Sequence, residues 1–242
     1  MHRTIPAVPL LFFAMSTFAM STIAAPAMAQ DAEQEPQSAF TVSANVSLTS
    51  DYRFRGISAS NKNPAIQGGI DVSHDSGLFV GTWASSIATY GGSNMELDVY
   101  GGYSGSASAI DYTLTALVYL YPGGSGVNYA EFSGSFTTAA GPATVGMDIA
   151  WVPSQDNFGG DNFYVAGKGE LPLGDTKASL FGHFGYENGD AYDNKLDWEA
   201  GISYAAGPLT ASLSYVDSNY SGANQAGRLA TAGVMASVTA AF

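Results

Sequence analysis

The sequence predicts an all-β protein, a transmembrane antiparallel up-and-down β-barrel of about twelve strands. Three observations predict it: apolar and polar residues alternate along the chain, short and long connections separate the alternating segments, and charged residues are scarce. Hydrophobic residues make up 46% of the 242 residues and charged residues only 12%. Soluble domains carry about 25% charged residues, so this composition favours a surface that faces lipid.

We expect residues 1–29 to be a cleaved signal peptide that directs export to the outer membrane. His2 and Arg3 form a basic start, residues 10–20 are a short apolar stretch, and Ala27-Met28-Ala29 fits the A-x-A cleavage pattern. The apolar stretch is shorter than the roughly 20 residues that a spanning helix needs. A signal peptide is therefore favoured over a membrane anchor.

Residues 30–39 are polar and acidic and are expected to form a short disordered leader, which leaves 40–242 for the barrel. From residue 40 onward the dominant signal has a period of two, beginning with Phe40, Val42 and Ala44. Successive side chains of a strand point to opposite faces, so each segment has an apolar and a polar face. Strands are predicted at 40–48, 64–73, 77–85, 95–103, 110–120, 128–137, 142–151, 163–171, 176–186, 197–204, 208–216 and 229–242.

The predicted connections alternate strictly between short turns and longer polar stretches. This alternation is expected if all turns lie on the periplasmic side and all loops lie outside. The long stretches are 49–63, 86–94, 121–127, 152–162, 187–196 and 217–228.

Aromatic residues on the apolar face fall at the strand ends, as in the two aromatic girdles of a membrane barrel. In a soluble β-sandwich, which is the alternative fold, aromatic residues are not expected to concentrate at the strand ends. The turn-side group is Phe40, Tyr103, Tyr112, Phe136, Tyr204 and Phe242, and the loop-side group is Trp151, Phe163, Phe184, Trp198 and Tyr215.

The partners we expect follow from this placement. They are outer-membrane lipid and lipopolysaccharide, small solutes, and the barrel-assembly machinery, since the terminal Phe242 resembles the signal that this machinery recognises. The net charge of −13 argues against nucleic acid, which needs a basic surface. No cofactor or metal is expected, because the sequence has no cysteine, no phosphate-binding loop and no His-rich cluster.

Most charges of the predicted strands occupy the polar, inward face. A Lys or Arg on the lipid face at mid-membrane is destabilising by about 2–4 kcal/mol, so this placement is required by the fold. The charges either line a conducting lumen that prefers cations or pair across it and plug it. The candidate pore-lining residues are Asp71, Glu96, Asp98, Asp111, Glu131, Asp148, Lys168, Glu170, Asp197 and Glu199.

The segment Asp51-Tyr52-Arg53-Phe54-Arg55 is the one dense cationic feature of the sequence. Arg53 and Arg55 share parity and are expected at the outer end of the first strand, facing Asp71. Arginines opposed by acids form a constriction with a transverse field that selects solutes. The alternative is a salt-bridge cluster that fixes the first loop. Tyr52 and Phe54 are expected to face lipid or to pack under the loop.

Several stretches resemble the TorF-type porins, a proteobacterial family of outer-membrane proteins. The likeness spans nearly the whole mature chain, although after about residue 138 it is only a barrel pattern. It implies an outer-membrane barrel and a pore, and no substrate. The stretches are Ser50–Ser58, which is the most specific, Gly77–Ser85, Glu96–Tyr103, Tyr121-Pro122-Gly123 and Asn128–Glu131.

The predicted function is an outer-membrane pore for passive diffusion of small cationic or neutral solutes. The alternative is a non-conducting barrel with a plugged lumen, which has a structural role or binds a partner through its loops. A lipid-modifying enzyme is not favoured, because catalysis needs a nucleophile, a base and an orienting group within hydrogen-bond reach. Only His183, with Ser179 nearby, is expected to point into the lumen.

Overall fold

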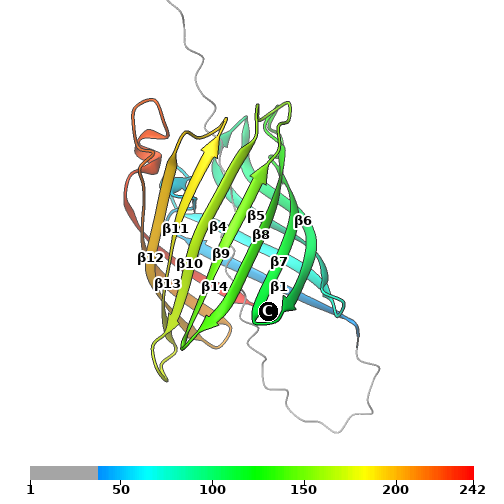
Figure 1. Cartoon of the computed structure of the whole chain (residues 1–242). Coiled ribbons are helices and arrows are strands. Elements are labelled where there is room, and N and C mark those ends of the chain that lie inside the picture. Colours follow the sequence, from blue (N-terminus) through cyan, green and yellow to red (C-terminus); the bar gives the residue numbers. More distant parts are fainter. Residues whose placement is uncertain (1–37) are drawn as a thin grey trace, which may run out of the picture.

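The computed structural model describes residues 38–242, which form a closed antiparallel barrel with a small hairpin and a short 3₁₀ helix (Figure 1). The predicted signal peptide and most of the predicted leader lie outside the described residues. The strands are β1 (Phe40–Thr49), β2 (Arg53–Phe54), β3 (Ile57–Ser58), β4 (Ala65–His74), β5 (Leu78–Tyr90), β6 (Ser93–Ala107), β7 (Ile110–Leu120), β8 (Tyr129–Ala140), β9 (Ala143–Val152), β10 (Asn162–Pro172), β11 (Ala178–Gly189), β12 (Lys195–Ala206), β13 (Leu209–Ser218) and β14 (Gly233–Ala241), and the 3₁₀ helix is η1 (Gly227–Ala230).

All twelve predicted strands are present and form the barrel wall, in which each strand pairs with its neighbours in chain order. β2 and β3 pair only with each other. β1 closes the ring by pairing with both β4 and β14. Lipid offers no hydrogen-bond partner to a free sheet edge, so a spanning sheet must close in this way.

The alternation of faces is confirmed. On β7, Leu114 and Val118 are 47% and 41% exposed, whereas Thr115, Leu117 and Tyr119, on the opposite face, are buried inside the barrel. The outer surface is therefore apolar and the lumen holds the polar side chains.

The loop-side aromatic belt is also present on the outer surface. Trp151 stacks between Phe132 and Phe163 on neighbouring strands, and Phe184 stacks on Trp198. No helix within residues 38–242 is both long and apolar enough to cross a membrane.

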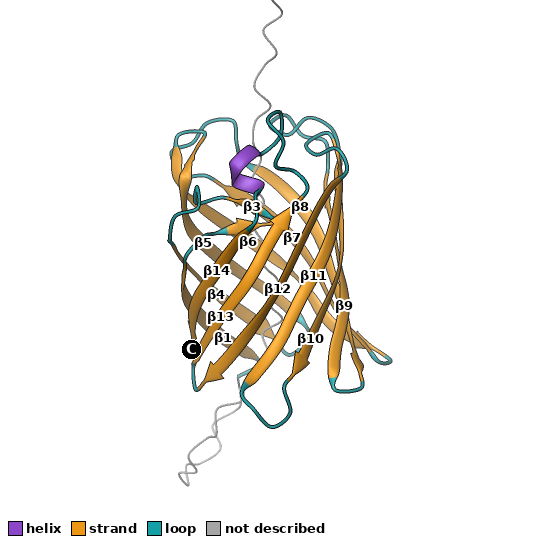
Figure 2. Cartoon of the chain, turned by 90° about the vertical axis from the view of Figure 1, so that its left-hand side faces the viewer, coloured by secondary structure: helices purple, strands orange, loops and turns teal. Residues whose placement is uncertain are grey.

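The loops and η1 lie at one end of the barrel, and the short turns and the C-terminus lie at the other (Figure 2). One predicted long loop, 86–94, is wrong. β5 and β6 continue through it and are joined by Gly91 and Gly92, with φ of +58° and +99°. Positive φ at both central residues is what a tight two-residue hairpin requires, and glycine adopts it without strain.

The last strand was predicted to begin at residue 229 and begins instead at Gly233. The intervening residues 227–230 form η1, which places Ala230 in a buried cluster with the first loop. Packing against that loop therefore replaces pairing in the sheet over this segment.

Candidate functional site

The connection between β1 and β4 folds into the lumen at the loop end of the barrel (Figure 2), which we call the outer end. We call residues 50–64 loop 1, and its β2–β3 hairpin is visible within the loop end of the barrel in Figure 2. Phe54, Ile57 and Ser58 are 5%, 3% and 0% exposed. The hairpin is therefore enclosed by the wall.

The local sequence determines the hairpin. Asp51 is its organising residue: its carboxylate accepts hydrogen bonds from the Ser58 hydroxyl at 2.6 Å and from Arg53 Nε at 2.7 Å. The reversal occurs at Arg55 and Gly56, with φ of +45° and +83°, the left-handed pair typical of tight hairpins. A Cβ on Gly56 would lie 2.8 Å from the Cβ atoms of residues 197 and 218, so the tip touches the β12–β13 wall.

Arg55 extends from the hairpin tip and joins two strands of the wall that are separated by β9 and β10. Its guanidinium lies 3.0 Å from a carboxylate oxygen of Glu131 on β8 and 3.0 Å from one of Glu187 on β11. It also lies 4.2 Å from the ring centroid of Tyr164. Burial opposes the charge of the guanidinium, but the two carboxylates outweigh burial and raise the pKa of Arg55 above its ordinary value.

Lys195 continues the ion-pair network along the wall. Its Nζ lies 2.7 Å from Glu187, 3.3 Å from Asp197 and 2.8 Å from the Arg55 carbonyl oxygen, to which it donates. Asp197 is also paired with His183 Nε2, at 2.9 Å. The hairpin backbone is therefore part of the network.

On the opposite side of the hairpin, tyrosines surround Glu96 of β6. Tyr52 of loop 1 donates to one carboxylate oxygen at 2.7 Å, and Tyr121 donates to the other at 2.9 Å. Burial, followed by the Glu96 charge, raises the pKa of Tyr52 well above its ordinary value. Within residues 38–242, Glu96 is therefore held by hydroxyl donors and not by a basic side chain.

The lumen has two layers that differ in access to water. In the outer layer the side chains of Glu187, Lys195 and Asp197 are 0% exposed. Toward the turn side, His183 and Asp148 side chains are 27% and 24% exposed, although both lie inside the barrel. Loop 1 therefore closes the outer layer, above a layer whose side chains are accessible to water and which we call the inner chamber.

Two predicted placements in loop 1 are wrong. Arg53 and Arg55 do not share a face of the first strand, because β1 ends at Thr49 and the chain turns at residue 55. Arg53 bonds to Asp51 and to the Thr231 carbonyl oxygen. Neither arginine faces Asp71, which accepts a hydrogen bond from Tyr100 at 2.6 Å.

Tyr52 and Phe54 do not face lipid. Both belong to the buried aromatic cluster inside the lumen, which agrees with the expected packing beneath the loop. Tyr52 packs edge-on against Trp83 of β5, with ring centroids 5.5 Å apart.

The remaining predicted residues lie at different depths. Glu96, Asp98, Glu131 and Asp197 are buried in the outer layer. In the inner chamber Lys168 pairs with Asp148 at 2.6 Å, and Glu199 lies 3.8 Å from His183. Asp111 and Glu170 are exposed near the turn-side ends of β7 and β10.

Sequence reasoning missed Glu187 and Lys195, which it assigned to a loop. The signal was present, since the alternation of β11 continues through outward Phe184 and Tyr186 to inward Glu187. Ser179 and His183, considered as a catalytic pair, share no hydrogen bond within the described chain.

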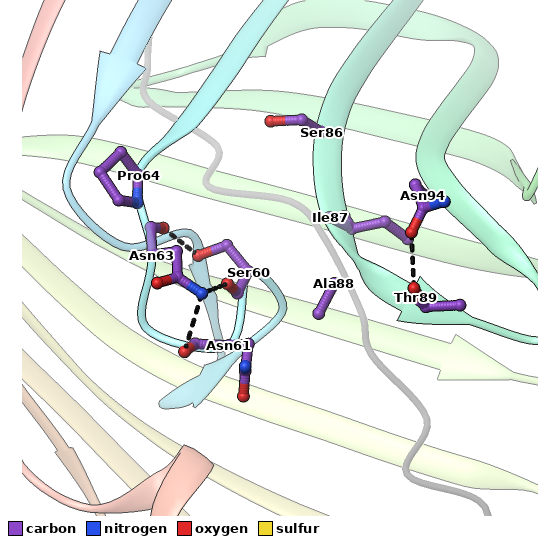
Figure 3. Close-up of a pocket in the computed structure, with 9 residues that line it drawn as sticks. All are labelled: Ser60, Asn61, Asn63, Pro64, Ser86, Ile87, Ala88, Thr89 and Asn94. Carbon is purple, nitrogen blue, oxygen red and sulfur yellow. Dashed lines mark hydrogen bonds between the residues drawn. The ribbon is translucent and has the colours of Figure 1, made fainter.

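Loop 1 meets the wall beside an open, uncharged pocket at the outer end of β5 (Figure 3). The Ala88 amide donates to the Ala59 carbonyl oxygen at 2.9 Å, and Asn63 is bonded within the loop to Ser60. The pocket thus marks the seam that fixes loop 1 to β5. It is lined by Ser60, Asn61, Asn63, Pro64, Ser86, Ile87, Ala88, Thr89 and Asn94.

The same barrel fold occurs in solved structures with little sequence identity. A KdgM porin matches with a TM-score of 0.57 and 9% identity, over 83% of this chain and 99% of that chain. A KdgM porin in complex with disordered oligogalacturonate gives 0.55 and 9%, over 83% and 98%. A structure titled "Unveiling the Mechanism Behind the in-meso Crystallization of Membrane Proteins" gives 0.54 and 10%, over 83% of each chain.

At these identities the likeness shows the fold alone. No curated protein matches the chain in sequence. A family model described as "Bacterial protein of unknown function (Gcw_chp)" matches residues 33–242, and the chain therefore belongs to the Gcw_chp family.

Proposed function

We propose that this protein is an outer-membrane channel for small solutes, and that loop 1 is the gate at its outer entrance. One observation carries the proposal: the lumen is closed by a loop, while the wall beneath it leaves side chains accessible to water. A barrel without a channel would have side chains filling both layers of its lumen, as the smallest barrels do. The shared fold of the KdgM porins and the resemblance of residues 50–58 to TorF-type porins support the same reading.

We further propose that the channel favours cationic and neutral solutes. In the outer layer, the carboxylates of Glu96, Asp98, Glu131, Glu187 and Asp197 outnumber the bases Arg55 and Lys195. An excess of one sign in a low-dielectric lumen raises the local concentration of counter-ions. Oligogalacturonate, the ligand in the KdgM complex, is a polyanion, and the negative charge of this lumen would repel it.

In this proposal the predicted pore-lining residues divide between two roles. Asp148, Lys168, Glu199 and Asp71 line the hydrated chamber. Asp111 and Glu170 form its inner rim. The outer-layer carboxylates hold the gate through Arg55, while Asp51 and Arg53 shape it.

The second candidate function is a permanently closed barrel. The complete burial of the Glu187–Lys195–Asp197 group favours it, because breaking such a network is costly. Such a barrel would present its loops to a partner or serve the envelope as a structural element.

The two functions are separated by conductance of the refolded mature chain in planar bilayers, with and without loop 1. Thr49 pairs directly with Ala65, so a short Gly-Ser turn can replace residues 51–63 without stretching the wall. Replacement of the 173–177 turn, at the opposite end, is the matched control. Heat-modifiable gel mobility confirms folding of each variant.

We expect steady cation-selective conductance from the truncated barrel, brief openings from the intact chain, and no effect of the control. A folded truncated barrel that does not conduct would refute the channel, because the wall itself would then close the lumen. Conduction by the truncated barrel with an intact chain that never opens would favour the closed barrel.

A further inference from the structure

The outer layer of the lumen holds more wall carboxylates than cations to pair with them. Five acidic side chains of the strands are buried there, and the described residues supply them with only two permanent cations. Arg55 pairs with Glu131 and Glu187, and Lys195 pairs with Glu187 and Asp197. The two acids that remain are successive inward residues of β6.

These two residues, Glu96 and Asp98, are paired with no basic side chain within residues 38–242. Glu96 receives the hydroxyls of Tyr52 and Tyr121. Asp98 is 1% exposed, and its Oδ1 has no hydrogen-bond partner in the described chain. A carboxylate that is taken out of water without a counter-charge becomes neutral rather than stay ionised.

The groups that face Asp98 bring it no positive charge. It lies directly opposite Trp83 of β5 and Tyr119 of β7 in the two adjacent pairings. A like charge nearby disfavours the ionised form of a carboxyl, and two of its neighbours are acidic. The titratable groups that face it are Glu96 and Tyr100 on β6, Tyr119 on β7, Glu131 on β8 and Tyr52 on loop 1.

Loop 1 separates this part of the lumen from water. Tyr52 packs against Trp83, with ring centroids 5.5 Å apart, and donates to Glu96 at 2.7 Å. Tyr52 and Phe54 belong to the same buried aromatic cluster as the rings beside Asp98. Withdrawal of loop 1 would therefore give water access to Glu96 and then to Asp98, one inward position closer to the turns.

We propose that docking of loop 1 in the lumen is coupled to the uptake of one proton by Asp98, so that acid closes the lumen and alkali opens it. The proposal rests on the proposed role of loop 1 as a gate. In the docked state, which the structure shows, a neutral Asp98 removes the unpaired charge. In the undocked state Asp98 faces water and is ionised near neutral pH. The docked state therefore binds one proton more, and the state that binds more protons is favoured as pH falls.

One linked proton changes the ratio of undocked to docked chains by up to about tenfold for each pH unit. The ratio rises with pH, starting above about pH 4, where an aspartate in water ionises. Below that pH the acids that hold Arg55 take protons as well, which weakens docking. The useful range is therefore about pH 5–8.

Docking can be measured without conductance, because the sequence has no cysteine. Ile57→Cys places one thiol in the hairpin, where the native side chain is 3% exposed. A water-soluble methanethiosulfonate reagent then reaches this thiol only when loop 1 is undocked. Ala223→Cys, in the exposed connection between β13 and η1, reports the pH dependence of the thiol itself. The ratio of the two labelling rates, in refolded full mature chains, gives the undocked fraction.

Two substitutions are compared in the Ile57→Cys chain. Asp98→Asn keeps the shape of the side chain and removes its titration, and Asp98→Ser replaces it if the first does not fold. Glu170→Gln, an equal change of charge at the exposed inner rim, is the matched control.

The corrected labelling rate should rise at least tenfold, by roughly up to tenfold for each pH unit, between about pH 5 and 8. Glu170→Gln should keep this rise, and Asp98→Asn should stay at the low, acidic rate throughout. His183 also titrates in this range, but it is present in all the chains, so the difference between them isolates Asp98.

A corrected rate that does not rise with pH in the Ile57→Cys chain overturns the proposal without any further variant. An Asp98 variant that keeps the full rise does the same. Bilayer conductance of these chains separates this result from the proposed channel. A silent barrel whose labelling rises with pH would refute the channel and leave the proton coupling intact. A conducting barrel whose labelling ignores pH would refute only the coupling.

Discussion

Removal of Arg55 should open the outer layer. Its guanidinium, 8% exposed, is the charge that ties the hairpin tip to Glu131 and Glu187, which are 1% and 0% exposed. Removing one partner of such a buried pair is destabilising by about 3–5 kcal/mol, because the remaining charges stay buried. When loop 1 swings out, water solvates both carboxylates. The substitution therefore raises the free energy of the closed state more than that of the open state.

At about 1.4 kcal/mol for each factor of ten, this difference shifts the open-to-closed ratio by roughly a hundredfold to several thousandfold. The assay is the open probability of single Arg55→Ala channels at fixed voltage. Arg55→Lys should give an intermediate shift, because a lysine is a point charge and cannot hold two carboxylates in a fixed fork.

Lys177→Ala, an exposed residue of the 173–177 turn at the opposite end of the barrel, is the control and should behave as wild type. An unchanged open probability in a folded Arg55→Ala barrel would refute the reasoning, since the strongest contact of the gate would then have no part in gating.

Four further predictions follow from the geometry. Gly56→Ala should raise the open probability without a change of charge, because its Cβ would lie 2.8 Å from wall atoms at a φ of +83°; wild-type gating would contradict the tip contact. The pKa of Tyr52 is raised by burial and then by Glu96, so the folded state keeps its proton above pH 10 while the unfolded state loses it. The free energy of unfolding, measured with urea, should therefore fall as pH rises above 10, and it should fall less steeply in Tyr52→Phe. Equal slopes in the wild type and Tyr52→Phe would assign the loss of stability to other groups. Glu199→Gln should lower the cation-to-anion permeability ratio of the truncated barrel, measured as the reversal potential in a salt gradient; an unchanged ratio would place selectivity outside the chamber. Deletion of Phe242 removes two backbone hydrogen bonds to β1, 2.9 and 3.1 Å long, and should lower stability by about 1–3 kcal/mol and reduce assembly in cells.

The wall of the barrel was predictable because its signal is local. Period two appears within any few residues, and lipid forces every strand to show it. The segments from Phe40 to Thr49 and from Ile110 to Leu120 needed no knowledge of distant residues. Errors fell at the strand ends: residues 86–90 extend β5, although Ser86, Ala88 and Thr89 do not continue the strong apolar alternation that marks its first half.

Loop 1 was not predictable in the same way. Its contacts join positions 76, 132 and 178 residues apart in the chain, and no local pattern encodes such distances. Counting alternate residues onward from β1 placed Arg53 and Arg55 on one face, but β1 ends at Thr49 and the chain turns back at Arg55. The sequence analysis predicted neither the β2–β3 hairpin nor its direction into the lumen, because Arg-Gly is not one of the pairs that mark a two-residue turn.

The sequence separation of these contacts also fixes when loop 1 reaches its place during folding. The hairpin follows the first strand, yet its partners lie on β8, β11 and β12, and the Lys195–Arg55 contact spans 140 residues. Contacts between residues so far apart in the sequence form late, because the intervening chain must first be ordered. The wall must therefore curl around an undocked, hydrated loop 1, and the lumen becomes sealed only after the last strands have closed the ring.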